Sequence, residues 1–314
     1  MMQKSDLEGK TIVVTGATSG IGRAAAIALA ARGAFVIGVG RSTQRCEETR
    51  AAILAEHPEA RVDFCLADLG SQRQVRALAA AIRARIAAAG GDKLDVLVNN
   101  AGSVSNWYKA TEDGYELQFA VNHLAPFLLT HELLPLLRSA PAARVVTVSS
   151  ASHYRTRMHW ADVMYRHAYN CLAAYKQSKL ANVLFTAEFN RRIGSRTRIC
   201  AYAADPGLVN TQIGLKGTGG LVRWVWDRRR GHGVSPAQGA ETAVFLASDP
   251  EVALSRGFYW KDCEPKMPSR YARNAAHAAR LWALSERLCG VTWPDAGADA
   301  VRPMVSGPAP ALLR

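Results

Sequence analysis

The chain alternates short apolar runs with longer segments in which apolar residues recur at helical spacing. The apolar runs predict strands at residues 11–15, 34–39, 61–66, 94–98, 144–148, 198–203 and 257–260. Strands that are apolar at almost every position are typical of a parallel sheet covered on both faces. The alternation therefore predicts an α/β fold, a Rossmann-type doubly wound parallel sheet of about seven strands with helices on both faces.

The segments between these runs predict helices. They cover residues 21–32, 42–57, 71–89, 112–137, 172–193, 235–248 and 272–288. Pro126 predicts a bend within the long segment 112–137. Because no linker or repeat interrupts the pattern, residues 1–290 are expected to form a single domain. Residues 291–314, rich in Pro, Gly and Ala, are expected to form a loosely ordered tail.

Composition and charge narrow the class of protein. The chain has 314 residues, 49% of them hydrophobic, and a net charge of +13. The arginines are mostly scattered along Ala-rich helices without a nucleic-acid-binding signature, so an anionic cofactor or a membrane surface explains the charge without a dedicated nucleic-acid role. No signal peptide or bilayer-length apolar run occurs, which predicts a cytoplasmic protein without a transmembrane anchor. The cysteines and histidines show no metal-ligand spacing, so no metal is expected.

Tyr175 and Lys179 are four residues apart in a predicted helix, which places them on one face. A nearby ammonium favours a phenolate, so Lys179 is expected to lower the pKa of the Tyr175 phenol. A phenol tuned in this way can exchange a proton with an alcohol or carbonyl oxygen. The spacing alone is common in proteins, and the alternative is an ordinary surface pair.

A glycine-rich turn follows the first predicted strand and precedes a helix. It reads Thr15-Gly16-Ala17-Thr18-Ser19-Gly20-Ile21-Gly22. Glycines in this context let backbone N–H groups approach a pyrophosphate at the helix N-terminus. The turn therefore predicts a dinucleotide site, although glycines also occur in turns that bind nothing.

Five motifs occur in one order along the chain, four of them at the ends of predicted strands and one within a predicted helix. They are 15–22, Asn99-Asn100-Ala101-Gly102, Ser149-Ser150, Tyr175 with Lys179, and Asp205-Pro206-Gly207. In order and context they resemble the short-chain dehydrogenase/reductase superfamily over roughly residues 8–260. The resemblance implies cofactor contacts from the glycine turn, namely Gly16, Thr18, Ser19, Gly20, Ile21 and Gly22. It places Asp68 and Leu69 at the adenine, and Asn100, Ala101 and Gly102 near the ribose. At the nicotinamide end it implies contacts from Pro206, Gly207 and Thr211. A plain alternative for Asp68 is a helix N-terminal cap.

The end of the second strand indicates which cofactor is bound. Members that use NAD carry an acidic residue there, whereas this chain reads Gly40-Arg41-Ser42. Arg41 can pair with a 2′-phosphate, assisted by Arg45 and Arg23, which predicts NADP(H). The alternative is a solvated arginine at a strand end.

The resemblance also implies catalytic roles. Tyr175 exchanges the proton, Lys179 supports it and binds the nicotinamide ribose, and Ser150 rather than Ser149 binds the substrate oxygen. Asn122 matches a fourth residue that helps hold a proton-relaying water. Its alternative role is to satisfy backbone groups within a helix.

The chain further resembles the retinol dehydrogenase-like branch of this superfamily. The similar segments are 119–124, 127–130, 178–186 and 281–286, together with a 25-residue step from Ser150 to Tyr175 that is long for the superfamily. The branch implies a lipophilic carbonyl or alcohol substrate. Substrate contacts are expected from 103–111, 151–174 and a lid at 208–233. They carry the aromatics Trp107, Tyr108, Trp160, Trp224 and Trp226, which either line an apolar pocket or pack the lid onto the body.

The leading hypothesis is an NADP(H)-dependent oxidoreductase that transfers hydride to or from a lipophilic carbonyl or alcohol. One alternative is a dehydrogenase of steroid- or polyketide-like secondary alcohols, and another is a catalytically silent cofactor-binding regulator. The complete set of Asn122, Ser150, Tyr175 and Lys179 argues against the silent regulator. A homodimer is one expected assembly. The basic, amphipathic segment 221–230 predicts either a lid or a peripheral membrane contact.

Overall fold

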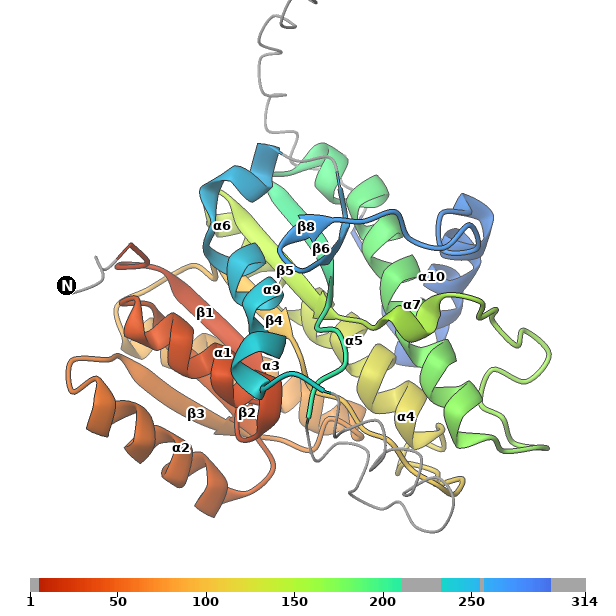
Figure 1. Ribbon diagram of the computed structural model, residues 1–314, viewed down its shortest axis with the longest axis horizontal. Coiled ribbons are helices and arrows are strands. Elements are labelled where there is room, and N and C mark those ends of the chain that lie inside the picture. Colours follow the sequence, from red (N-terminus) through yellow and green to blue (C-terminus); the bar gives the residue numbers. More distant parts are fainter. Residues whose placement is uncertain (1–5, 211–232, 255–256, 295–314) are drawn as a thin grey trace, which may run out of the picture.

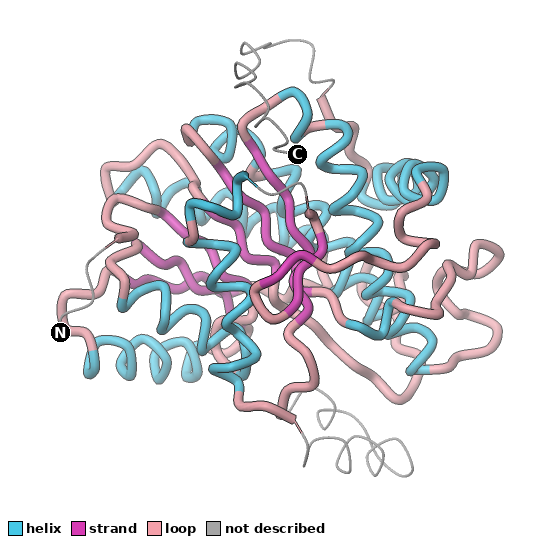
Figure 2. Tube along the Cα trace, turned by 45° about the horizontal axis from the view of Figure 1, so that its top comes forward, coloured by secondary structure: helices cyan, strands magenta, loops and turns pink. Residues whose placement is uncertain are grey.

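The computed structural model describes residues 6–210, 233–254 and 257–294. Its centre is one eight-stranded sheet with the strand order β3-β2-β1-β4-β5-β6-β7-β8. Figure 1 shows helices in front of and behind this sheet, and Figure 2 shows the strands as a layer between them. The predicted doubly wound α/β class is therefore confirmed.

The strands agree closely with the apolar runs of the sequence. They are β1 (Thr11–Thr15), β2 (Phe35–Gly40), β3 (Val62–Leu66), β4 (Val96–Asn99), β5 (Ala143–Val148), β6 (Ile199–Asp205), β7 (Tyr259–Lys261) and β8 (Glu264–Pro265). The neighbours from β3 through β7 are parallel, and β8 pairs antiparallel with β7. The expected number was about seven. The eighth strand has only two residues, too few to show a periodic pattern in the sequence.

The helices cover both faces of the sheet. One face carries α1 (Gly20–Ala31), α2 (Thr43–Glu56) and α9 (Pro236–Ser248), and the other carries α3 (Gln72–Ala88), α5 (Ala125–Glu132), α6 (Leu134–Ser139), α7 (Cys171–Arg192) and α10 (Ala275–Cys289). Alternation along β1 shows how a strand serves both layers. Val13 points into the core under α3 and α7, whereas Ile12 and Val14 point into the core under α1 and α9.

Capping residues fix where two helices begin. Ser235 and Gln238 form a reciprocal capping box at the start of α9, and the first-turn proline follows directly. The N-cap of α3 is Ser71, whose hydroxyl accepts from the N–H of Gln74. The capping role considered for Asp68 is therefore wrong. Its carboxylate accepts from the N–H of Gly70 and shapes the turn before the helix.

The predicted helix at residues 112–137 is broken into shorter pieces. Its first segment α4 (Leu117–Phe119) starts only after Glu116, because that carboxylate caps the N–H groups of Gln118 and Phe119. A π-helical turn, η1 (Ala120–Leu124), follows and leads into α5. Pro126 lies in the first turn of α5, which continues directly from η1 with helical dihedral angles at Leu124 and Ala125. The bend expected at Pro126 stays a prediction.

Parallel strands bring the carboxyl ends of β1 to β6 to one edge of the sheet. The segments after these strands carry the motifs identified in the sequence. Within the parts of the chain that the structure describes, no helix has both the length and the apolar character needed to cross a membrane.

Candidate active site

The glycine turn between β1 and α1 is built around close backbone approaches. A Cβ on Gly22 would lie 2.2 Å from Nδ2 of Asn100 and 2.4 Å from the backbone oxygen of Gly16, so only glycine fits there. Gly16 itself has a φ of +69°. Ser19 occupies the N-cap of α1, and no side chain caps the helix there. The first-turn N–H groups thus face outward at the positive end of the helix, which suits an anionic phosphate.

Asn100 and Ala101 tie the loop after β4 to this turn. The N–H groups of both residues donate to Oγ1 of Thr15 at 3.0 Å, and Nδ2 of Asn100 donates to the backbone oxygen of Thr15 at 2.8 Å. The side chain of Asn100 is therefore committed to holding two loops together. Ala101 and Gly102, the other two predicted cofactor contacts in this segment, are half-buried.

The remaining predicted cofactor residues lie along the same edge. Arg41 is exposed directly after β2, Asp68 is exposed after β3, and Leu69 beside it is buried. Pro206 and Gly207 follow β6 and are half-buried. Thr211 lies outside the described residues.

Lys179 and Tyr175 occupy one face of α7, as their spacing predicted. Lys179 is buried, and its Nζ donates to the backbone oxygen of Val148 at 2.9 Å. The same Nζ lies 5.8 Å from the centroid of the Tyr175 ring. Burial lowers the pKa of Lys179 to about 8, although the negative charge of Asp205 acts in the opposite direction.

The predicted lowering of the Tyr175 pKa is wrong for the protein without its cofactor. Burial and, to a smaller extent, the charge of Asp205 raise the pKa of Tyr175 to about 12, although a hydrogen bond with Ser150 acts against both. The reason is geometric, since Lys179 lies over the ring and is bonded to Val148. At neutral pH this phenol therefore holds its proton.

The two serines after β5 take different roles in the structure. Ser149 is buried, and its hydroxyl donates to the backbone oxygen of Lys179 at 2.8 Å. Ser150 is half-buried, and its side chain interacts with the Tyr175 phenol. The structure thus brings Ser150 and Tyr175 together, whereas Ser149 supports α7.

Asn122 lies fully buried in the π-helical turn η1. Its Oδ1 accepts from the N–H of Ser103 at 2.7 Å, and its Nδ2 donates to the backbone oxygen of Ser103 and to Oγ of Ser178. The Ser178 hydroxyl in turn donates to the backbone oxygen of Tyr175. Asn122 therefore fastens the loop after β4 to α7. These contacts satisfy backbone groups of the loop rather than of its own helix, and the proton-relay role of Asn122 stays a prediction.

Asp205 is a buried site residue to which the sequence analysis gave no role. It is the last residue of β6 and is 1% exposed. Its Oδ1 accepts from the N–H of Gly207 at 3.0 Å, and its Oδ2 accepts from the Tyr259 hydroxyl at 2.7 Å. An acidic residue directly before Pro206 at a strand end was the available signal.

Comparison with protein families matches residues 10–217 to the family described as short chain dehydrogenase. Retinol dehydrogenase 14 of Homo sapiens is 37% identical over 306 residues, which cover 91% of this chain and 88% of that protein. The chain belongs to the short-chain dehydrogenase family. Within it, the chain falls in the retinol dehydrogenase-like branch and is an oxidoreductase.

Two further similarities support this membership. Polyprenol dehydrogenase of Mus musculus is 40% identical over 294 residues, covering 91% of this chain and 86% of that protein. A crystal structure from Beutenbergia cavernae, described as an NAD(P)-dependent gluconate 5-dehydrogenase with bound NADP, is 26% identical. It has a TM-score of 0.64 and covers 82% of this chain and 97% of its own. A nicotinamide cofactor is therefore expected at the glycine turn of this short-chain dehydrogenase.

Two of the three predicted substrate segments meet beside η1. The Tyr169 hydroxyl donates to the backbone oxygen of Ser105 at 2.9 Å and to the buried Glu116 carboxylate at 3.0 Å. Tyr108 packs edge-on against the Tyr169 ring, with centroids 5.9 Å apart. Trp107, the residue before Tyr108, is 74% exposed. The segment after β4 therefore presents an aromatic ring to solvent.

The contacts of Trp160 favour a packing role for this side chain over a place in the lining of a substrate pocket. Its Nε1 donates to the Tyr271 hydroxyl at 2.9 Å, and the Arg280 guanidinium lies 4.4 Å from the centroid of its ring. These contacts fasten the segment after β5 to α10. Trp224, Trp226 and the basic segment 221–230 lie outside the described residues, as does most of the predicted lid.

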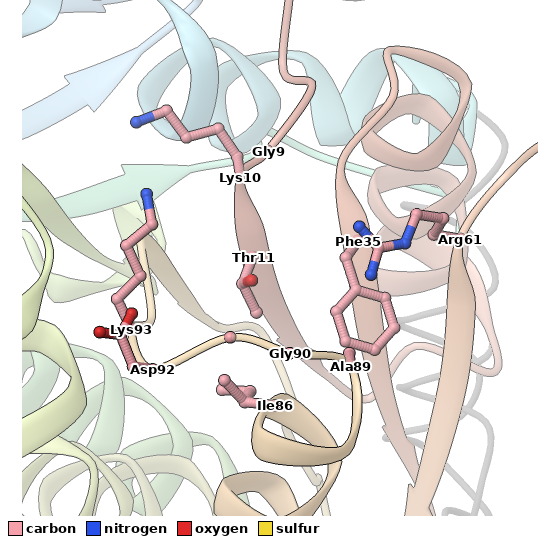
Figure 3. A pocket seen from close by; sticks show the side chains of 11 residues that line it. Gly9, Lys10, Thr11, Phe35, Arg61, Ile86, Ala89, Gly90, Asp92 and Lys93 are labelled. Carbon is pink, nitrogen blue, oxygen red and sulfur yellow. The ribbon is translucent and has the colours of Figure 1, made fainter.

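A cavity of about 240 Å³ lies at the opposite edge of the sheet and is separate from this site. It is lined by Lys10 before β1, Phe35 at the start of β2, Arg61 before β3, and the loop after α3 (Figure 3). These positions mark the amino ends of the strands, whereas the glycine turn and Tyr175 follow carboxyl ends. The cavity is therefore not the dehydrogenase site.

Proposed function

We propose that the chain is an NADP(H)-dependent oxidoreductase that moves a hydride between the nicotinamide and a carbonyl or alcohol of a lipophilic substrate. One observation carries the proposal, namely the meeting of Ser150, Tyr175 and Lys179 at the edge of the sheet that also carries the glycine turn. A proton donor, an oxygen-binding hydroxyl and a cation are the groups that reduction of a carbonyl requires.

Tyr175 is assigned as the proton donor to the substrate oxygen. Because the pKa of its phenol is raised to about 12, the side chain is in its acid form at neutral pH. A protonated donor is ready for carbonyl reduction, whereas alcohol oxidation requires the phenolate first. Ser150 donates to the same substrate oxygen and stabilises the negative charge that develops on it.

Lys179 is assigned two functions through its charge. It favours the phenolate left after Tyr175 has donated its proton, and it donates hydrogen bonds to the nicotinamide ribose. Its present bond to Val148 uses one N–H of the terminal ammonium and leaves the others for a ligand. Asn122 is assigned as a positioning residue, because it holds α7 against the loop after β4.

The cofactor supplies or accepts the hydride when bound, and this chain's residues fit NADP(H). The uncapped first turn of α1 offers N–H donors to the pyrophosphate. Arg41 is exposed at the end of β2 and free of any ion pair found in the described residues. Arg41 is assigned to the 2′-phosphate, because a planar guanidinium can donate two parallel hydrogen bonds to a phosphate group.

A lipophilic substrate is supported from two directions. Retinol and polyprenol, the alcohols named in the titles of the two similar dehydrogenases, are long apolar molecules. In this chain, exposed Trp107 and half-buried Tyr108 border the site after β4. Aromatic surface beside a few polar groups is typical of pockets for apolar ligands.

The test is NADPH oxidation in the presence of aldehydes, ketones and quinones, each offered as a long-chain and a short-chain homologue. Turnover with long-chain carbonyls that is lost in Tyr175→Phe supports the proposal. Equal turnover by Tyr175→Phe contradicts the assigned acid. A preference for short-chain homologues contradicts the substrate class, and faster turnover with NADH contradicts the cofactor assignment. Cofactor binding without any turnover favours the silent regulator.

A further inference from the structure

Glu116 and Gln118 are two buried polar side chains at the start of α4 that the proposed hydride transfer does not use. Glu116 is 1% exposed, and Gln118 is fully buried. The Glu116 carboxylate forms no ion pair within the described segments. Buried polar groups are costly unless they are hydrogen-bonded, so the partners of these two side chains show what they hold in place.

Both side chains reach the segment directly before α7. The Tyr169 hydroxyl donates to Oε1 of Glu116 at 3.0 Å. Nε2 of Gln118 donates to the same hydroxyl at 2.6 Å and to the backbone oxygen of Cys171 at 3.1 Å. Cys171 is the first residue of α7, and Tyr175 lies one helical turn further along. The beginning of the helix that carries Tyr175 is therefore fastened to α4.

The Tyr169 hydroxyl also holds the loop after β4. It lies 2.9 Å from the backbone oxygen of the buried Ser105, and its single hydrogen serves both this oxygen and the Glu116 carboxylate. Oγ of Ser105 donates in turn to the backbone oxygen of Trp107 at 2.8 Å. The Tyr169 ring packs against the Tyr108 ring. One hydroxyl thus connects α4 to the loop that carries the two aromatic residues assigned to the substrate.

This connection is separate from the one that Asn122 makes to the same loop. Asn122 binds the backbone of Ser103, which directly follows Gly102 on the expected cofactor side. Tyr169 binds Ser105, which leads to the exposed aromatic side of the loop. The loop is therefore fastened at two points, and Tyr169 controls the one nearer to the proposed substrate.

We propose that Tyr169 acts as a latch on residues 103–108 and thereby determines a preference for long apolar substrates. Glu116 and Gln118 hold its hydroxyl in place. The inference rests on the proposed function for the identity of the substrate, and on the contacts above for the latch itself. Tyr169 is a positioning residue in this proposal, since it acts through the loop.

The chemistry of the hydroxyl suits this task. Burial and, to a smaller extent, the charge of Glu116 raise the pKa of Tyr169, so the hydroxyl keeps the hydrogen that it donates. A long apolar substrate needs a fixed apolar surface along its length, whereas a short one needs little beyond the groups at its reacting oxygen. Release of the loop should therefore weaken the binding of long substrates more than that of short ones.

Limited proteolysis tests the latch without relying on activity. Chymotrypsin cleaves after aromatic residues such as the exposed Trp107, and its rate at a folded site follows local opening. Tyr169→Phe keeps the ring and removes only the hydroxyl. The cut after Trp107, identified by fragment mass, should become about 3–10-fold faster, which is the effect expected for loss of one hydrogen bond.

Tyr202→Phe is the matched control for this experiment. The Tyr202 hydroxyl also donates to a backbone oxygen, that of Val252, but Tyr202 lies in the core under α1 and α9. Its removal should leave the cut after Trp107 unchanged. An unchanged rate in Tyr169→Phe, or an equal increase in Tyr202→Phe, overturns the latch.

Glu116→Gln provides a second variant of the same contact. It keeps an oxygen for the N–H groups at the start of α4 and removes the carboxylate that receives the Tyr169 hydroxyl. The cut after Trp107 should again be faster, and the double variant should be no faster than Tyr169→Phe alone, because both changes break one contact. Increases that multiply in the double variant overturn the latch.

Kinetics test the specificity. In Tyr169→Phe, KM for a long-chain carbonyl should rise about 3–10-fold, while kcat, the NADPH dissociation constant and KM for the short-chain homologue change less than about 2-fold. Equal increases in KM for both homologues, or a parallel loss of NADPH affinity, overturn the specificity role. A parent protein without turnover contradicts the proposed function instead, and the cleavage rates still decide whether the latch exists.

Discussion

The ammonium of Lys179 lies over the ring of Tyr175, with Nζ 5.8 Å from the ring centroid. The contact depends on the ring rather than on the hydroxyl, since Nζ donates to the backbone oxygen of Val148. The two side chains can therefore be separated by mutation. Removing the hydroxyl leaves the packing of α7 in place, whereas removing the ammonium takes away the charge.

Tyr175→Phe should abolish turnover and leave cofactor affinity nearly unchanged. Loss of a positioned general acid lowers kcat by about 10²–10⁴-fold. Lys179→Met should lower kcat and also weaken NADPH binding, because the ribose donor is lost. Measuring kcat together with the NADPH dissociation constant by fluorescence distinguishes the two variants. Equal cofactor affinity in both would remove Lys179 from the cofactor site.

The neighbouring serines form a matched pair. Ser150→Ala removes the hydroxyl that interacts with Tyr175 and should lower kcat by about 10²-fold. Ser149→Ala removes a buried bond to the backbone oxygen of Lys179 and should cost about 1 kcal/mol of unfolding free energy. Kinetics and denaturant unfolding of both variants check the assignment. A larger kcat loss in Ser149→Ala would reverse it.

Arg41→Ala should reduce cofactor discrimination. A charge-assisted bond to the 2′-phosphate contributes about 1.5–3 kcal/mol, so the NADPH dissociation constant should rise about 10–150-fold while that of NADH stays constant. Arg50→Ala provides the control, since Arg50 is also exposed and lies farther along α2. Titration of both nucleotides against both variants is the measurement. Parallel weakening of NADH and NADPH would contradict a phosphate-specific role.

Gly22→Ala should disrupt the glycine turn. Its Cβ would lie 2.2 Å from Nδ2 of Asn100, so the loop after β4 must shift and cofactor binding should be lost. Gly114→Ala is the matched control, because its Cβ meets no atom within 4 Å and only its φ of +77° is unfavourable. That backbone strain costs about 1 kcal/mol and lies away from the turn. Normal NADPH affinity in Gly22→Ala would contradict the close approach.

The burial of His123 predicts that the unfolding free energy of the protein falls in acid. His123 is fully buried, its Nε2 lies 2.8 Å from Oγ of Ser285, and burial lowers its pKa to about 3. The unfolded chain binds a proton near pH 6.5, whereas the folded protein does so only near pH 3. The stability that His123 contributes is therefore complete above pH 6.5 and is lost as the pH falls toward 3, by about 1.4 kcal/mol per unit.

Denaturant unfolding between pH 7 and pH 4 tests this dependence. His123→Gln should make the curve of unfolding free energy against pH shallower by that slope, whatever its effect at pH 7. Identical slopes in the parent and His123→Gln would show that His123 does not titrate in this way.

Much of the fold was predicted from periodicity because each strand and helix carries its own signal. The apolar runs located β1 to β7, and glycine, proline and capping residues located most helix ends. The segment 112–137 was mispredicted, since its composition is helical throughout. Its late start depends on the Glu116 carboxylate capping from a buried position, which local sequence does not specify.

By itself, the sequence determined the class of sheet, the edge at which the site forms and the residue types available there. These follow from local patterns, because strand ends and motifs are fixed along the chain. Only the tertiary structure decided the charges and contacts within the site. It separated Ser149 from Ser150, raised rather than lowered the Tyr175 pKa, and buried Asp205 against the Tyr259 hydroxyl. Burial and long-range electrostatics come from residues distant in sequence, so no spacing along the chain could reveal them.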